Sequence, residues 1–186
     1  MACNLSKGRI IPCNDAIGGI KGLYFIEYGT LTPAFDSTKT NVLDDLGAVT
    51  AYAYDIKNDA SGLTETLNSP AGNGVTYVDQ VISAVLARGE WSTNAEMRLL
   101  AYGRPHVVVH FKTGEAVVVG LYNGASLETG VKTSGNAAGD LNGYTLTINA
   151  QEKAYANYLE GATESNPFAG LTTAPTVVSG TEVTPA

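Results

Sequence analysis

The residues of this sequence that could do chemistry begin with two histidines, His106 and His110. On a helix, a spacing of four residues would place both imidazoles on one face, where they could bind zinc. The residues between and after them, 107–109 and Phe111, are β-branched or aromatic and predict a strand instead. Four residues of a strand span roughly 13 Å, which is too far for two ligands of one metal ion. We therefore expect exposed or interface histidines without a catalytic or metal-binding role.

A group of aspartates raises the question of a magnesium or calcium site. Its members are Asp44, Asp45, Asp55, Asp59 and Asp79. Carboxylates are the usual ligands of both ions. The sequence around these aspartates, however, lacks the D-x-[DN]-x-[DN]-G pattern of a calcium-binding loop. We expect these aspartates to be solvated residues of turns.

The two cysteines, Cys3 and Cys13, both lie near the N-terminus. No histidine is close to them in the sequence, which argues against a zinc site. Two interpretations remain open. The thiols stay reduced, or they form a small disulfide loop after assembly or release of the protein.

The sequence also lacks the motifs that mark common enzyme classes. A glycine-rich segment at residues 18–22 (GGIKG) precedes a predicted strand, whereas a phosphate-binding loop connects a strand to a helix. No G-x-x-x-x-G-K-[ST] or G-x-S-x-G motif is present. We therefore expect a protein that is not an enzyme and that uses no cofactor and no metal ion.

Composition narrows the remaining function classes. The chain has 186 residues, enough for one domain, and its 11 basic and 18 acidic residues give a net charge of −7. A surface that binds nucleic acid needs clustered Lys and Arg, so specific DNA binding is not expected. No apolar run approaches the roughly 20 residues of a membrane helix, and the N-terminus lacks the apolar core of a secretion signal. We expect synthesis and folding in a cytoplasm, without a membrane partner.

Strands are predicted where β-branched and aromatic residues gather or alternate with polar residues. These segments are residues 20–28, 49–57, 63–67, 107–111, 116–119, 125–132 and 144–150. Residues 75–86 fit either a strand or a helical stripe, and their β-branched content favours the strand. The chain is therefore predicted to be mainly β.

One helix is predicted at residues 94–102. Thr93 and Glu96 have the spacing of a capping box at its start. Gly103 can take the left-handed conformation that ends a helix, and Pro105 prevents its continuation. The apolar face of this helix is predicted to consist of Met97, Leu100 and Ala101.

Three segments are predicted to lie outside regular structure. Residues 1–19 contain several Gly and Pro and form an extended arm, and residues 58–74 form a long mobile loop or hairpin. Residues 161–186 are rich in Thr, Pro, Gly and Ser, and such a tail cannot fold alone. We expect this tail to lie on a neighbouring subunit or to be flexible, which leaves residues 20–160 as the single domain.

Several segments of the sequence resemble structural proteins of tailed bacteriophages that infect Bacteroidota, including relatives of the crAss-like group. The resemblance lies in MACNLSKGR with CNDAIGGIKGLYF, in RLLAYGRPHVVV, and in GDLNGYTLTINAQEK with AYANYL. It covers residues 1–159, and within that group the pattern looks like a tail-tube protein.

The resemblance implies an antiparallel β-sandwich or barrel with one flanking α-helix. It also implies hexameric rings of this chain that stack into a tube, assembled in the bacterial host cytoplasm, through which DNA passes without specific binding. The expected partners are other copies of the chain and other virion proteins. The residues that we expect at subunit contacts are Cys3, Leu5, Arg9, Ile10, Tyr52, Tyr54, Phe168 and Leu171. The acids that we expect to line the channel are Asp55, Asp59, Glu65 and Glu115.

Two other functions remain open. A capsid-decorating or head–tail connector protein would have the same composition, but it would join a lattice or a ring instead of forming tubes. A glycan-binding β-sandwich is a more remote alternative, in which Trp91 would supply a stacking platform. The competing interpretation of Trp91 is that it packs beside the start of the helix.

Overall fold

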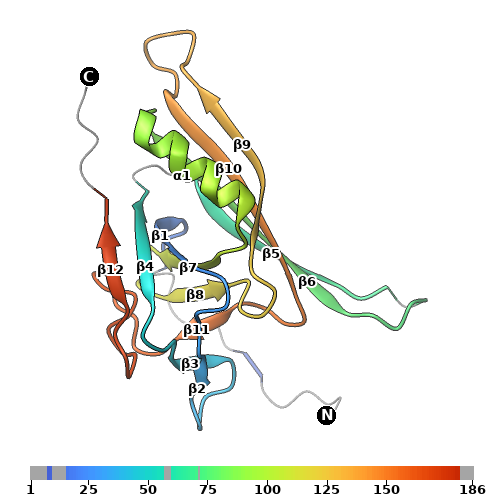
Figure 1. Cartoon of the computed structure of the whole chain (residues 1–186). Coiled ribbons are helices and arrows are strands. Elements are labelled where there is room, and N and C mark those ends of the chain that lie inside the picture. The colour runs from blue at the N-terminus through green and yellow to red at the C-terminus, as the bar shows by residue number, and fades with distance from the viewer. Residues whose placement is uncertain (1–7, 10–15, 57–59, 71, 181–186) are drawn as a thin grey trace.

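The fold is a β-sandwich with one flanking helix, shown as a computed structural model in Figure 1. The structure describes residues 8–9, 16–56, 60–70 and 72–180. Two sheets pack face to face, and the predicted fold class is confirmed.

The larger sheet, sheet A, has eight strands among the described residues, in the order β12-β4-β1-β7-β8-β11-β3-β2. They are β1 (Ile20–Ile26), β2 (Ala34–Phe35), β3 (Val42–Asp45), β4 (Thr50–Asp55), β7 (His106–Phe111), β8 (Ala116–Val119), β11 (Asn157–Leu159) and β12 (Thr176–Ser179). The smaller sheet, sheet B, has the order β5-β6-β10-β9. Its strands are β5 (Gly62–Asn68), β6 (Tyr77–Ala87), β9 (Ser126–Thr133) and β10 (Gly143–Glu152). The single described helix is α1 (Trp91–Tyr102).

The β7–β8 hairpin is the centre of sheet A, and both of its faces are buried. Val107 and Val109 pack in the core between the two sheets, which we call the inter-sheet core. Val108 points to the opposite face of the sheet and into a second apolar cluster, the outer core. Burial on both faces explains why this hairpin has an unbroken apolar run instead of an alternating one.

The strands of sheet B alternate instead. On β6, Val78, Gln80, Ile82 and Ala84 are buried, whereas Asp79, Val81 and Ser83 between them face away from sheet A. The strand interpretation of residues 75–86 is therefore confirmed. β5 forms a seven-residue antiparallel ladder with β6, so the strand predicted at residues 63–67 is confirmed, and of the two interpretations of residues 58–74 the hairpin is the one that the structure shows. Figure 1 shows the β5–β6 hairpin projecting away from the rest of the molecule.

The helix begins three residues earlier than predicted, at Trp91, and no side chain caps its start. The predicted capping box with Thr93 as N-cap is therefore wrong. The Tyr144 hydroxyl lies 3.0 Å from the Glu90 carbonyl oxygen and 2.7 Å from Asn94 Oδ1, and this tertiary contact holds the first turn. Gly103 has φ −90°, so it does not take the predicted left-handed conformation.

Met97 and Leu100 pack against the inter-sheet core, as predicted. Ala101 was placed on the same apolar face but is exposed. The helix therefore covers the core with a narrow contact, and no residue of α1 is fully buried. Among the described residues, no helix is long and apolar enough to cross a membrane.

The segment after β11 belongs to the domain. Phe168 and Leu171 are buried in the outer core, and the Phe168 ring packs edge-on against Tyr24 with 5.1 Å between centroids. Further along, β12 adds to sheet A as a parallel partner of β4. For residues 161–180, the prediction of a tail that lies on a neighbouring subunit is wrong, because Phe168 and Leu171 belong to the chain's own outer core and β12 pairs with β4.

Candidate assembly interface

The two histidines are buried, and the prediction that they are exposed or at an interface is wrong. The Gly29 N–H donates to His106 Nε2 at 3.2 Å, so Nδ1 must carry the proton and donate to the Gly120 carbonyl at 2.7 Å. His110 Nε2 lies 2.9 Å from the Thr163 carbonyl oxygen. Burial lowers the pKa of both imidazoles. Both rings therefore act as neutral hydrogen-bonding parts of the scaffold.

A buried amide, Gln80, links the two sheets. The Gly120 N–H donates to Gln80 Oε1 at 3.0 Å, and Gln80 Nε2 donates to Glu65 Oε1 at 3.2 Å. Glu65 also accepts a hydrogen bond of 2.7 Å from the Ala156 N–H. Glu65 thus faces the inside of the sandwich, and its predicted place among the channel acids is wrong.

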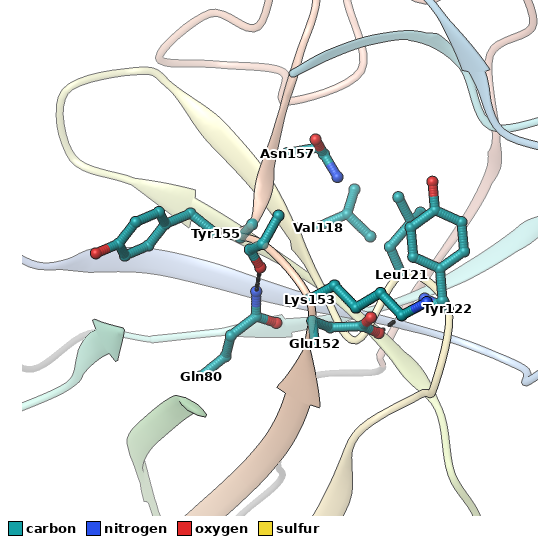
Figure 2. Close-up of a pocket in the computed structure, with 10 residues that line it drawn as sticks. Gln80, Val118, Leu121, Tyr122, Glu152, Lys153, Tyr155 and Asn157 are labelled. Atoms are coloured by element: carbon teal, nitrogen blue, oxygen red, sulfur yellow. Dashed lines mark hydrogen bonds between the residues drawn. The ribbon is translucent and has the colours of Figure 1, made fainter. Parts of the chain in front are cut away.

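A small cavity of about 40 Å³ lies beside this network. Figure 2 shows Gln80 and Glu152 on one side of it, with Asn157 and Val118 on the other. The Glu152 carboxylate is occupied, because it accepts hydrogen bonds of 2.8 and 2.7 Å from the N–H groups of Tyr122 and Asn123. The cavity has room for a few water molecules.

The outer face of sheet B is the broadest polar surface with a regular pattern. The outward residues, by register, are Thr64, Thr66 and Asn68 of β5, Tyr77, Asp79, Val81, Ser83 and Val85 of β6, Ser126, Thr129, Val131 and Thr133 of β9, and Thr145, Thr147, Asn149 and Gln151 of β10. None of them is Lys or Arg. Lys132 points to the opposite side of β9, where its Nζ lies 5.6 Å from the centre of the Tyr144 ring.

Asp79 is the acid among the outward residues of this face, near the end of sheet B where β6 begins. Asn68 Nδ2 donates to its Oδ2 at 2.7 Å, and Gln151 Nε2 donates to its Oδ1 at 2.8 Å. The three side chains form a polar row across β5, β6 and β10. The prediction that Asp79 lies in a solvated turn is wrong, because it belongs to β6, whose alternation places it opposite the buried residues.

An open cleft of about 550 Å³ lies where the outer face meets the turn after β8. It is lined by Arg104, Asn123, Gly124, Ser126, Glu128, Asn149, Ala150 and Gln151. The Arg104 guanidinium donates to the Asn123 carbonyl and lies 5.3 Å from the centre of the Tyr28 ring. Asn149 Oδ1 is buried there without a hydrogen-bond partner among the described residues.

The other predicted channel acids do not gather on this face. Asp55 ends β4 and Glu115 lies in the turn before β8; both are exposed, and strands β1 and β7 separate them in sheet A. Asp59 lies outside the described residues. The predicted set is therefore not brought together. The acid on the outer face of sheet B is Asp79, which was not a member of that set.

The residues predicted at subunit contacts have different outcomes. Tyr52 is 41% exposed and Arg9 is exposed. Tyr54 packs edge-on against Phe25, and its burial, together with the charge of Glu96, raises its pKa to about 12. Phe168 and Leu171 are buried in the chain's own outer core, which corrects their assignment. Cys3, Leu5, Ile10 and Cys13 lie outside the described residues.

Helix α1 presents an unpredicted apolar surface. Trp91 is 82% exposed, so the interpretation that it packs beside the helix start is wrong. Leu99 and Tyr102 are 63% and 77% exposed. Residues three, eight and eleven positions apart lie on one side of a helix, so these three form a stripe that faces away from the core. We call Trp91, Leu99 and Tyr102 the helix stripe.

Comparisons with protein-family models, with curated proteins and with solved structures find no match to this chain. The function is therefore inferred from the geometry of the chain itself. Among the described residues, no three His, Cys, Asp or Glu side chains are arranged to hold a metal ion. The surfaces that stand out are strand edges, the outer face of sheet B and the helix stripe, all of which suit contacts between macromolecules.

Proposed function

We propose that this chain is a structural protein of a phage virion, most specifically a tail-tube subunit that forms stacked hexameric rings around a DNA channel. Other copies of the chain and other virion proteins would be its partners. The observation that carries the proposal is sheet B, with its open edges and its outer face without cationic side chains.

Both edges of sheet B are available for pairing. β5 and β9 are the outermost strands, and neither pairs on its outer side with another strand of the described residues. An unpaired edge presents a row of backbone donors and acceptors that another chain can satisfy. A sheet with two such edges can join copies through β5 of one subunit and β9 of the next, which is a heterologous contact of the kind that builds a ring when the rotation between subunits closes.

The outer face of sheet B suits the inside of such a ring. Thr, Ser, Asn and Gln make up most of its outward residues, with Tyr77, Val81, Val85 and Val131 among them, and Asp79 is the one charged residue in this set. Repeated around a ring, these aspartates would give the channel a negative potential that repels DNA phosphates. DNA could then pass without adhering. The net charge of the whole chain, −7, has the same sign.

The direct test is negative-stain electron microscopy of the untagged protein over a concentration series. Stacked rings or tubes are the expected result. A chain that stays monomeric at every concentration would contradict self-assembly and would direct attention to a decoration or connector protein that needs another virion component.

A variant with a blocked edge makes the test specific to sheet B. Thr129→Pro removes a backbone N–H from the edge strand β9, and we expect it to abolish tubes. Thr172→Pro is a matched proline control in the exposed segment before β12, away from sheet B. Because the Thr172 N–H donates to the Asp44 carbonyl, the folding of both variants must be checked by circular dichroism. Tubes from folded Thr129→Pro would exclude the β9 edge as a subunit contact.

A further inference from the structure

The helix stripe consists of three exposed apolar side chains on one side of α1. Trp91, Leu99 and Tyr102 are each more than 60% exposed, and the Arg98 guanidinium lies 5.9 Å from the centre of the Tyr102 ring. Single exposed apolar residues are ordinary, whereas several on one side of a helix that include a Trp and a Tyr are typical of an interaction site.

The chain has a second exposed apolar group at the outer edge of sheet A. Tyr52 of β4 and Val178 of β12 are partners in the parallel ladder and therefore lie side by side on one face. They are 41% and 43% exposed. We call these two residues the edge patch. Figure 1 shows β12 and β4 side by side at one edge of the molecule.

We infer that the helix stripe of one copy packs against the edge patch of the next copy. This inference rests on the proposed function, since it names a second contact between neighbouring subunits of the ring. The stripe supplies large aromatic side chains, and the edge patch supplies a flat surface of Tyr and Val on a strand with one open side. Two different patches of the same chain make a heterologous contact, the kind that generates closed rings.

The charges favour a second copy as the occupant of the stripe. Three acidic residues, Glu90, Glu96 and Glu128, lie on or around α1, and Glu128 lines the same cleft as Arg104. Four basic residues lie on or around it: Arg88, Arg98, Arg104 and Lys132. The remaining seven basic and 15 acidic residues of the sequence give −8. The surroundings of the helix therefore carry a small positive charge and are attracted to the predominantly acidic remainder of another copy.

Trp91 makes the contact measurable, because it is the only tryptophan of the chain. Its fluorescence emission reports the polarity around the ring, and burial at an interface shifts the emission to shorter wavelength. Two double variants separate the two halves of the contact. The stripe variant, Trp91→Ala with Tyr102→Ser, keeps the edge patch. The edge variant, Tyr52→Ser with Val178→Lys, keeps the stripe.

We expect neither variant to form tubes by itself. When they are mixed, the intact stripe of the edge variant meets the intact edge patch of the stripe variant, and the product is a heterodimer. Its tryptophan comes from the edge variant alone, so a blue shift on mixing reports burial of Trp91. Sedimentation velocity gives the size of the product.

Matched controls keep the test specific. Val177→Lys places the same charge one residue earlier on β12, on its opposite face, and should leave tubes intact. Tyr155→Ser removes another exposed aromatic ring, one that lies away from α1. All the substituted residues are well exposed, so circular dichroism should show native folds, and Leu99→Ala serves as a milder stripe variant.

Each outcome separates this inference from the proposed function. Tubes from both double variants would overturn the stripe contact and leave self-assembly intact. A concentration-dependent blue shift of the edge variant alone would mean that two stripes pack together, which also overturns it. If the wild-type protein forms no tubes, the proposed function fails; a blue shift on mixing would still support the contact, and no shift would reject it.

Discussion

The backbone N–H of Gly29 donates a hydrogen bond to Nε2 of His106, which therefore must keep its lone pair. The other nitrogen donates to the Gly120 carbonyl, and the Tyr28 ring stacks on the imidazole with 5.2 Å between centroids. Protonation of His106 would break the hydrogen bond from Gly29, because both nitrogens would then be donors. The fold thus selects the neutral imidazole at a place where three chain segments meet.

The first prediction is a loss of stability at mildly acidic pH. Burial lowers the pKa of His106 and His110 in the folded state, so the unfolded chain binds these protons first as the pH falls. Their stabilising contribution is complete above the unfolded pKa of about 6.5 and decreases as the pH drops below it. Urea unfolding at pH 8, 6.5 and 5 should show a falling free energy of unfolding.

The pH effect should depend on the histidines themselves. Asp36, Asp45 and Asp140 have pKa values lowered by hydrogen bonds, but their contribution is lost only at more acidic pH, as the pH falls below the ordinary range of a carboxyl group. The double variant His106→Asn with His110→Asn should therefore be nearly flat between pH 8 and 5. An equal slope in wild type and variant would contradict the prediction.

The second prediction compares two adjacent leucines of α1. Leu100 packs against the inter-sheet core, whereas Leu99 is exposed. Leu100→Asp should lower the free energy of unfolding by about 2 kcal/mol or more, because it places a carboxylate against apolar side chains. Leu99→Asp should change it by less than about 0.5 kcal/mol. Equal effects in chemical denaturation would show that the core-facing side of the helix is wrongly assigned.

The third prediction concerns the C-terminal part of the domain. Phe168 is buried with Leu171 in the outer core, so Phe168→Ala should destabilise the monomer by about 3–5 kcal/mol. Val177→Ala, on the exposed strand β12, should cost less than about 1 kcal/mol. Both are measured by thermal or urea unfolding at a concentration too low for assembly. A small change in the free energy of unfolding for Phe168→Ala would indicate instead that residues 161–180 pack against a neighbouring subunit.

The fourth prediction tests the channel face. Asp79 lies on the outer face of sheet B, and Glu115 lies in a turn of sheet A. Asp79→Lys should make assembled tubes retain short duplex DNA at low salt, with retention that weakens steeply as salt is raised. Glu115→Lys changes the net charge equally and should retain less. Equal retention by the two variants would place the outer face of sheet B away from the channel.

The sequence by itself determined the mainly β character, most strands, the presence of one helix and its two core residues, Met97 and Leu100. These features depend on local patterns, namely alternation with period two, β-branched content and a stretch with good helix formers. The same local reasoning failed at the ends of α1. There a tertiary contact from Tyr144 replaced the expected cap, and Gly103 stayed extended.

Only the tertiary structure decided what the individual residues do. The histidines became buried because strands far apart in the sequence enclose β7, and Phe168 became a core residue because residues 161–180 return to cover sheet A. Trp91 and Asp79 lie on the surface because the sandwich covers only one side of α1 and one side of β6, and these two residues are on the uncovered sides. The reason is that burial and hydrogen-bond partners arise from long-range pairing, and no local pattern in the chain records which distant segment will supply the partner.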